Sequence, residues 1–233
     1  MEGKVSAALK LLDKESASGV LKLTDQVMKE LKLKHPEPAP VKDNSLLNGP
    51  IDIVSESFFQ SIDEQTVMKA ALDTKGSAGP SGMDAELYRR ILCSKNFNAA
   101  GKDLREEIAT FARNLSTKTY EPDLLGAFVA SRLIPLDKNP GIRPIGVGEV
   151  LRRIVGKMVS RRAANDIKES AGPLQTCAGH GAGAEAAIHA MHPIFEDDGT
   201  DAVLLIDATN AFNCLNRAVA IIFELLAPTS LAT

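Results

Sequence analysis

One carboxylate follows a short apolar run at residues 202–206, and an aromatic residue comes soon after it. In the stretch AVLLIDATNAF, Asp207 lies at the end of what reads as a buried strand, and Phe212 follows a turn. Such an acid suits metal-dependent nucleotidyl transfer, an aspartyl-nucleophile phosphotransferase or simple helix capping. The phosphotransferase requires a second aspartate two positions on, and Thr209 occupies that position. Thr209 therefore makes the phosphotransferase the less favoured alternative, and nucleotidyl transfer and helix capping both stay open at this point.

The charge is unevenly distributed along the 233 residues, although the net charge is only −3. Residues 132–168 carry nine Lys or Arg against three acids, whereas residues 183–207 carry six acids and no Lys or Arg. This pattern is typical of a protein that binds a polyanion with one surface and a divalent metal ion with another. It also suits two solvated faces. No apolar run approaches the ~20 residues of a membrane span, and the N-terminal residues do not read as a secretory signal, so we expect an intracellular protein without membrane contact.

The elements that must position these groups can be predicted from periodicity and turn signals. Amphipathic helices are expected within residues 3–34, followed by a proline-rich linker at 35–50, and further helices are expected at 63–72, 84–93 and 102–115. Residues 124–136 and 142–147 read as two strands of a hairpin, joined by an Asn-Pro-Gly turn. An apolar stripe then predicts a helix after Gly148, on which Arg153, Lys157 and Arg161 share another face. A helix at 184–192 that ends at Pro193, a strand at 202–206 and a helix at 217–226 complete the prediction.

Four motifs in this order resemble those of reverse transcriptases, in particular those of non-LTR retrotransposons. LLIDATNAFNCLNR resembles the first palm motif, and RLIPLDKNPGIRPIGVGEVLRRIVGKMV, residues 132–159, is similar to the fingers motif. KGSAGPSGMDAELYRRIL, residues 75–92, resembles the Pro-Gly motif, and QTCAGHGAGAEAAIHAM, residues 175–191, resembles the segment between fingers and palm. The resemblance implies an α+β, helix-rich, incomplete right-hand polymerase fold, with a fingers β-hairpin and one palm strand. Its parts would be an N-terminal helical segment (1–34), the linker (35–50), a fingers region (51–183) and the start of a palm (184–233).

Carried over residue by residue, the resemblance assigns roles to several positions. Asp207 would be the catalytic acid that ligates Mg²⁺, and Ala211 and Phe212 would bind the nucleotide, with Phe212 as the gate at its sugar. Arg143, with Lys138, would contact the incoming triphosphate, since an arginine fork matches phosphate oxygens. For Arg153, Lys157 and Arg161 two interpretations stay open, contact with template phosphates and a solvated face.

Three other patterns imitate functional sites. FEDD, residues 195–198, resembles a second metal-binding acid pair but precedes Asp207 and lacks flanking apolar strands. Glu185, His189 and His192 share a helical face but lack a fourth zinc ligand. GHGAG, residues 179–183, lacks the preceding strand and the Lys-Ser/Thr of a phosphate loop.

Two-metal nucleotidyl transfer requires carboxylates from two palm motifs, and this sequence supplies one. We therefore expect a fragment of an RNA-directed DNA polymerase that is inactive alone, whose parent enzyme binds an RNA or DNA template-primer and a dNTP. The alternative is a non-catalytic module that binds nucleic acid or protein. The apolar strand at 202–206 would lack neighbours, which predicts exposed backbone groups and self-association through that strand.

Overall fold

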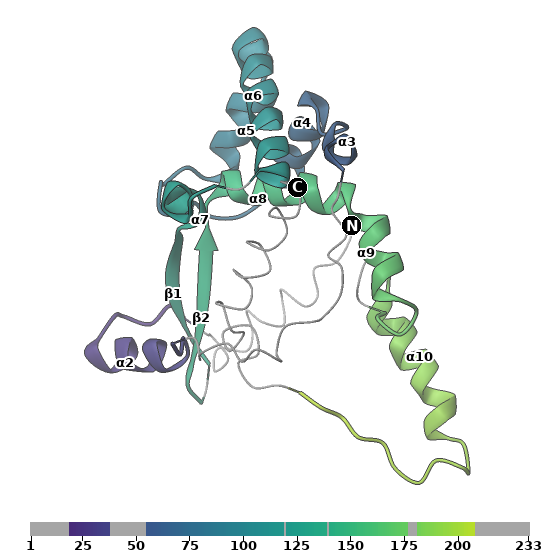
Figure 1. Ribbon diagram of the computed structural model, residues 1–233. Coiled ribbons are helices and arrows are strands. Elements are labelled where there is room, and N and C mark those ends of the chain that lie inside the picture. Colours follow the sequence, from purple (N-terminus) through teal and green to yellow (C-terminus); the bar gives the residue numbers. More distant parts are fainter. Residues whose placement is uncertain (1–18, 38–54, 119, 139, 177–180, 208–233) are drawn as a thin grey trace, which may run out of the picture.

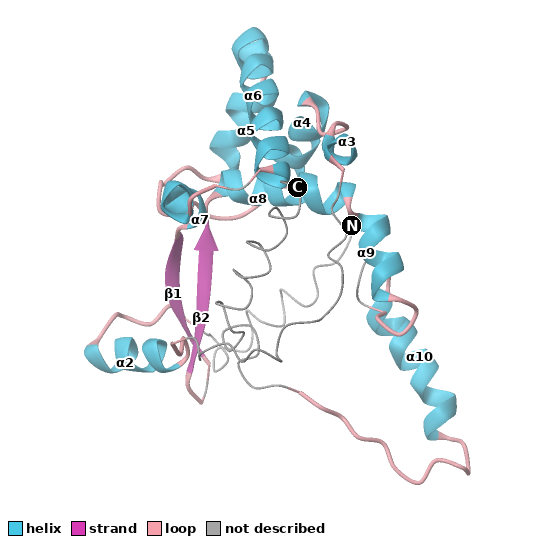
Figure 2. Ribbon diagram, in the orientation of Figure 1, coloured by secondary structure: helices cyan, strands magenta, loops and turns pink. Residues whose placement is uncertain are grey.

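The computed structural model describes residues 19–37, 55–118, 120–138, 140–176 and 181–207. These residues form mostly helices, with one antiparallel two-stranded sheet (Figures 1 and 2). The α+β class expected from the sequence is confirmed at this level. The expected helix at 217–226 and most of the linker at 35–50 lie outside the described residues.

Four helices make the main core: α4 (Glu64–Asp73), α5 (Ala85–Cys93), α6 (Asn98–Thr117) and α8 (Val150–Arg162). In Figure 1, α5 and α6 rise from α8, which lies across their base. The expected apolar stripe of α8 is confirmed, because Val150, Ile154, Val155 and Met158 are all buried in this core. They meet Val67 and Ala70 of α4, Leu92 of α5 and Ile108 of α6 in one cluster.

Local side-chain caps explain where two of these helices begin. The Asp63 carboxylate accepts a hydrogen bond from the Thr66 N–H at 2.8 Å, and the Asp84 carboxylate accepts one from the Leu87 N–H at 2.8 Å. Each cap satisfies an N–H group that has no partner inside its helix. The caps place α4 and α5 within one residue of the starts expected from the sequence.

The hairpin consists of β1 (Ser131–Asp137) and β2 (Ile142–Gly148), with Ser131 opposite Gly148 and Asp137 opposite Ile142. Gly141 has φ +99°, a conformation that favours glycine, and the Lys138 N–H donates to its carbonyl at 2.9 Å. The hairpin is therefore closed by the turn expected from the sequence.

The first strand was predicted too long. Residues 124–129 are helical instead, in η4 (Pro122–Leu125) and α7 (Gly126–Val129). The ring of Phe128 packs edge-on against Phe111 of α6, with centroids 5.4 Å apart. This tertiary contact anchors one side of the segment to the core, so the segment adopts a helical turn rather than extending the sheet.

Three shorter helices flank the core: α2 (Asp25–Leu33), which contacts the hairpin, α3 (Glu56–Phe59), and α9 (Ala164–Ala171), which follows α8. A short 3-10 turn, η3 (Lys95–Phe97), joins α5 to α6. The expected helix within residues 3–34 thus corresponds to α2, for the part that the structure describes, whereas α9 was not expected.

The last described segments differ from the prediction in two ways. Helix α10 (Gly183–Phe195) continues through Pro193, which was expected to end it. Only two helical residues follow Pro193, so the hydrogen bond that proline removes is lost in the last turn, where its effect on the helix is small.

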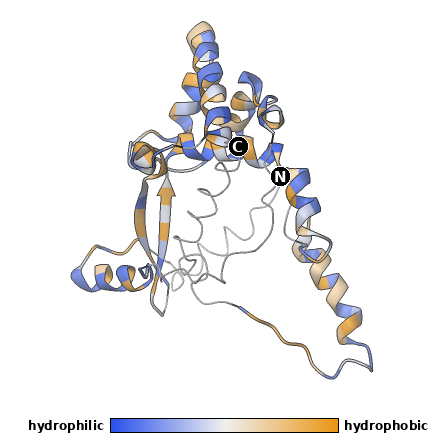
Figure 3. Cartoon of the chain, in the orientation of Figure 1, coloured by the Kyte–Doolittle hydropathy of each residue, from blue (hydrophilic) through white to orange (hydrophobic). Residues whose placement is uncertain are grey.

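Residues 202–206 were expected to form a strand but have no regular secondary structure. Leu204, Leu205 and Ile206 are 82–88% exposed, and no strand among the described residues pairs with them. A strand is stabilised by the ladder that it forms with a neighbour, so apolar composition alone does not produce one. In Figure 3, much of this segment and of α10 has the colour of hydrophobic residues, and both lie apart from the helical core.

Candidate nucleic-acid interface

The hairpin places basic and apolar side chains together on one of its two faces. Alternate residues of a strand share a face, and the register sets Arg132 opposite Val147 and Leu136 opposite Arg143. One face is therefore made by Arg132, Ile134 and Leu136 of β1 with Arg143, Ile145 and Val147 of β2. We call this the basic hairpin face, and no acidic residue belongs to it.

Both arginines of the basic hairpin face are exposed. Among the described residues, neither guanidinium makes an ion pair or a side-chain hydrogen bond, and the same holds for the exposed Lys138 beside the turn. Cations that have no protein partner retain their full capacity to bind an external anion. Arg143 and Lys138, the residues expected to contact a triphosphate, are thus exposed at the hairpin, and that contact stays a prediction. The sequence motifs did not identify Arg132. Alternation along the strand, counted from the turn, would have placed it on the same face as Arg143.

The arginines of α8 behave differently, because each binds the protein itself. Arg153 donates to the backbone carbonyls of Lys75 at 2.8 Å and of Ser77, and Arg161 pairs with the Asp73 carboxylate at 2.5 Å. That hydrogen bond holds the pKa of Asp73 below its usual range. Lys157, which lies between Arg153 and Arg161, is half-buried. Two of the three residues in this stripe are therefore engaged within the fold.

The two arginines that flank the stripe are also engaged. Arg162 donates to the carbonyl of Phe58 at 2.7 Å and stacks over its ring, 3.7 Å from the centroid. Arg152 donates to the carbonyl of Val129 at 3.1 Å. The arginines of α8 thus connect it to α3, to α7, and to the end of α4 with the loop after it, and the high basic count of this helix reflects these connections.

The Pro-Gly loop at residues 75–83 is fixed to the junction between β2 and α8. The buried Glu149 carboxylate accepts hydrogen bonds from the N–H and the hydroxyl of Ser81, each at 2.7 Å. A Cβ added to Gly79 would lie 2.8 Å from the Glu149 backbone nitrogen, so only glycine fits this close approach. Because Glu149 directly follows β2, these contacts tie the root of the hairpin to the helical core.

Asp207 is exposed, at the end of the irregular segment that begins at residue 201. No hydrogen bond or ion pair within the described residues joins it to Lys138 or Arg143. Ala211 and Phe212, the expected nucleotide-binding residues, lie outside the described residues. The expected Mg²⁺ ligation by Asp207 stays a prediction.

The other acidic and histidine patterns do not form a metal cluster either. Within the described part of the chain, no group of three or more His, Cys, Asp or Glu side chains is placed to hold a metal ion. Near the end of α10, the Nδ1 atom of His192 lies 3.1 Å from Oε2 of Glu196, and both side chains are about two-thirds exposed. A two-metal centre is therefore not assembled by the residues described, and we derive no catalytic step from them.

Comparison with known proteins adds no family to these observations, because no family model, no curated protein and no solved structure matches the chain. In the described ranges, no helix is both long enough and apolar enough to cross a membrane.

Proposed function

We propose that this chain contains the fingers and the start of the palm of a reverse transcriptase-like polymerase, and that its hairpin binds the phosphate backbone of nucleic acid or the triphosphate of a nucleotide. One observation carries the proposal. The exposed cations of the basic hairpin face have no partner among the described residues, whereas the arginines of α8 are bound internally. A polyanion would thus bind the hairpin rather than the helix.

The order of elements supports the same proposal. The fingers motif of the family is a hairpin followed by a helix. Residues 132–159, which resemble that motif, lie in β1, β2 and α8. The proposal also includes Mg²⁺ ligation by Asp207 and a sugar gate at Phe212, as the resemblance implies. In the parent enzyme, the partners would be an RNA or DNA template-primer and a dNTP.

Charge reversal at the hairpin tests the proposal. We would measure binding of the full chain to a single-stranded RNA and to an RNA–DNA hybrid over a series of salt concentrations, for the wild type, Arg132→Glu and Arg143→Glu. Each phosphate contact contributes about 0.7–0.9 to the slope of log K against log salt, so each variant should bind more weakly and with a shallower slope. Arg90→Glu is the matched control, since Arg90 is exposed on α5, away from the hairpin. Equal loss in all three variants would indicate non-specific attraction and contradict the proposal.

A second candidate is a non-catalytic protein-binding module, which one observation favours. Ile188, Met191, Ile194 and Phe195 of α10 are 42–71% exposed and lie along one side of the helix. Exposed apolar patches of this kind are typical of interaction sites. If none of the hairpin variants changes polyanion binding, this candidate becomes the better explanation of the chain.

A further inference from the structure

A short segment before α2 pairs with the edge of β1 that faces away from β2. The Leu21 N–H donates to the carbonyl of Pro135 at 2.9 Å, and the Asp137 N–H donates to the carbonyl of Gly19 at 3.0 Å. Between these bonds, Val20 lies opposite Leu136 in an antiparallel bridge. Residues 19–21 therefore cover the edge of β1 that faces away from β2. We call residues 19–33, which include α2, the N-terminal arm.

The two prolines of the hairpin are compatible with this arrangement. Pro135 and Pro144 lie opposite each other, and the carbonyl of Pro135 is directed at the arm rather than at β2. In an antiparallel strand, the N–H and C=O of one residue point to the same side, so the donors that these prolines lack would have faced outward. The ladder between β1 and β2 therefore loses no bond to proline.

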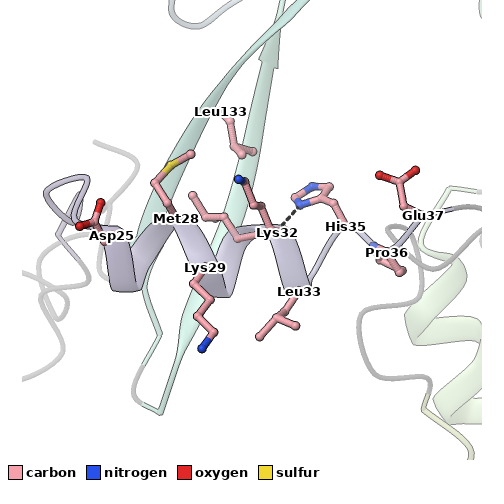
Figure 4. Close-up of a pocket in the computed structure, with 10 residues that line it drawn as sticks. Asp25, Met28, Lys29, Lys32, Leu33, His35, Pro36, Glu37 and Leu133 are labelled. Carbon is pink, nitrogen blue, oxygen red and sulfur yellow. Dashed lines mark hydrogen bonds between the residues drawn. The ribbon is translucent and has the colours of Figure 1, made fainter.

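The arm also contributes a small second core, separate from the helical one. Leu31 of α2 and Ile142 of β2 are only 3% and 4% exposed, yet neither belongs to the main hydrophobic cluster. Helix α2 contacts β2. Figure 4 shows Met28 and Lys32 of α2 near Leu133 of β1, around an open groove. Leu133 and Ile142 belong to the face opposite Arg132 and Arg143, so α2 packs on that opposite face. Val20, which lies opposite Leu136, adds an exposed apolar side chain to the basic hairpin face, and Arg132 and Arg143 remain exposed there.

We propose that the N-terminal arm is the element that positions the basic hairpin face for its anionic ligand, an inference that rests on the proposed function. A two-stranded hairpin alone is marginally stable in water and requires a third strand or a packed helix. The arm supplies one antiparallel bridge, at Val20, and a packed helix in which Leu31 is buried. Without the arm, the two strands would separate part of the time, and Arg132 and Arg143 would lose their fixed spacing.

Two variants of the arm test this proposal, each with a matched control. Leu21→Pro removes the N–H that bonds Pro135, and its control, Leu23→Pro, changes a residue that is 64% exposed. Leu31→Asp places a charge in the small core, and its control, Leu33→Asp, changes a residue that is 72% exposed. We expect the two test variants to speed amide exchange in β1 and β2 while α8 stays protected, and to weaken RNA binding about five- to tenfold. The controls should match the wild type in both measurements.

A disulfide provides the rescue that separates positioning from general destabilisation. Val20 and Leu136 form a non-hydrogen-bonded antiparallel pair, because the hydrogen bonds of the bridge are made by the residues on either side of them. The Cα atoms of such a pair lie about 4.5 Å apart, within disulfide range. In a background without the native cysteines, Val20→Cys with Leu136→Cys should restore RNA affinity to the Leu31→Asp variant when oxidised and lose it again when reduced. Unchanged exchange in the hairpin of Leu31→Asp, or faster exchange without loss of affinity, would overturn the proposal. Failure of the proposed function gives a different result, in which the wild type itself shows no binding that depends on Arg143.

Discussion

Ser81 donates two hydrogen bonds to one carboxylate, that of Glu149, from its backbone N–H and from its hydroxyl, each at 2.7 Å. The two residues are 68 positions apart in the sequence. Their contact joins the Pro-Gly loop to the point where β2 ends and α8 begins. Because the hairpin leaves the core at this point, the contact fixes the direction in which the basic hairpin face is held.

The Ser81–Glu149 contact should make stability depend on pH. The hydrogen bonds from Ser81, the hydroxyl first and the N–H second, hold the pKa of Glu149 below its usual range. A carboxyl whose pKa is lower in the folded state contributes stability above its unfolded pKa and loses it as the pH falls through its folded pKa. Glu149→Gln should therefore lower Tm at neutral pH and reduce the acid-induced loss of Tm. Thermal melts between neutral and acidic pH check this, with the exposed Glu107→Gln as the control that should follow the wild type.

Two glycine substitutions should have opposite effects on unfolding. Gly79→Ala should destabilise the fold, because the new methyl group would lie 2.8 Å from the backbone nitrogen of Glu149. Gly156→Ala in α8 should stabilise it by about 0.5–1 kcal/mol, because nothing lies within 4 Å of the added carbon and alanine favours a helix. Urea unfolding of both variants measures the two effects. A neutral Gly79→Ala would mean that the loop can move away from Glu149.

Substitution of an arginine in α8 should change stability, whereas substitution of an arginine in the hairpin should change RNA binding. Arg162→Ala removes a hydrogen bond to Phe58 and a cation–π contact, and it should cost about 1 kcal/mol of unfolding free energy without changing RNA affinity. Arg143→Ala should have the reverse effect, weaker RNA binding at unchanged stability. Urea unfolding and an RNA titration on both variants check the pair. Loss of RNA affinity in both would show that α8 also takes part in binding.

Amide hydrogen exchange should differ strongly between two apolar segments. Residues 202–206 should exchange quickly, because their side chains are exposed and no strand among the described residues covers their backbone. The amides of residues 154–159 in α8 should exchange slowly, since this helix is buried in the core. Mass spectrometry of exchanged peptides at several protein concentrations gives both rates. Protection of 202–206 that increases with concentration would support the expected self-association through this segment, whereas protection at all concentrations would show that the segment has a partner within the chain.

Local signals in the sequence determined much of the helical part. Asp63 and Asp84 mark helix starts because their carboxylates bond nearby N–H groups, and the stripe from Val150 to Met158 follows the helical period. The Asn-Pro-Gly turn between two apolar segments predicted the hairpin. All of these depend on residues close together in the chain, which is why the sequence alone could predict them.

Only the tertiary structure decided which of these residues remain available. The sequence left open whether Arg153 contacts template phosphates, but Arg153 bonds carbonyls 76 and 78 positions away, whereas Arg143 has no partner among the described residues. Residues 124–129 are helical where Phe128 meets Phe111, and residues 202–206 form no strand where no described strand pairs with them. The reason is the same in each case. Hydrogen bonds and packing between distant segments determine the outcome, and a local pattern contains no information about which segment will be its neighbour.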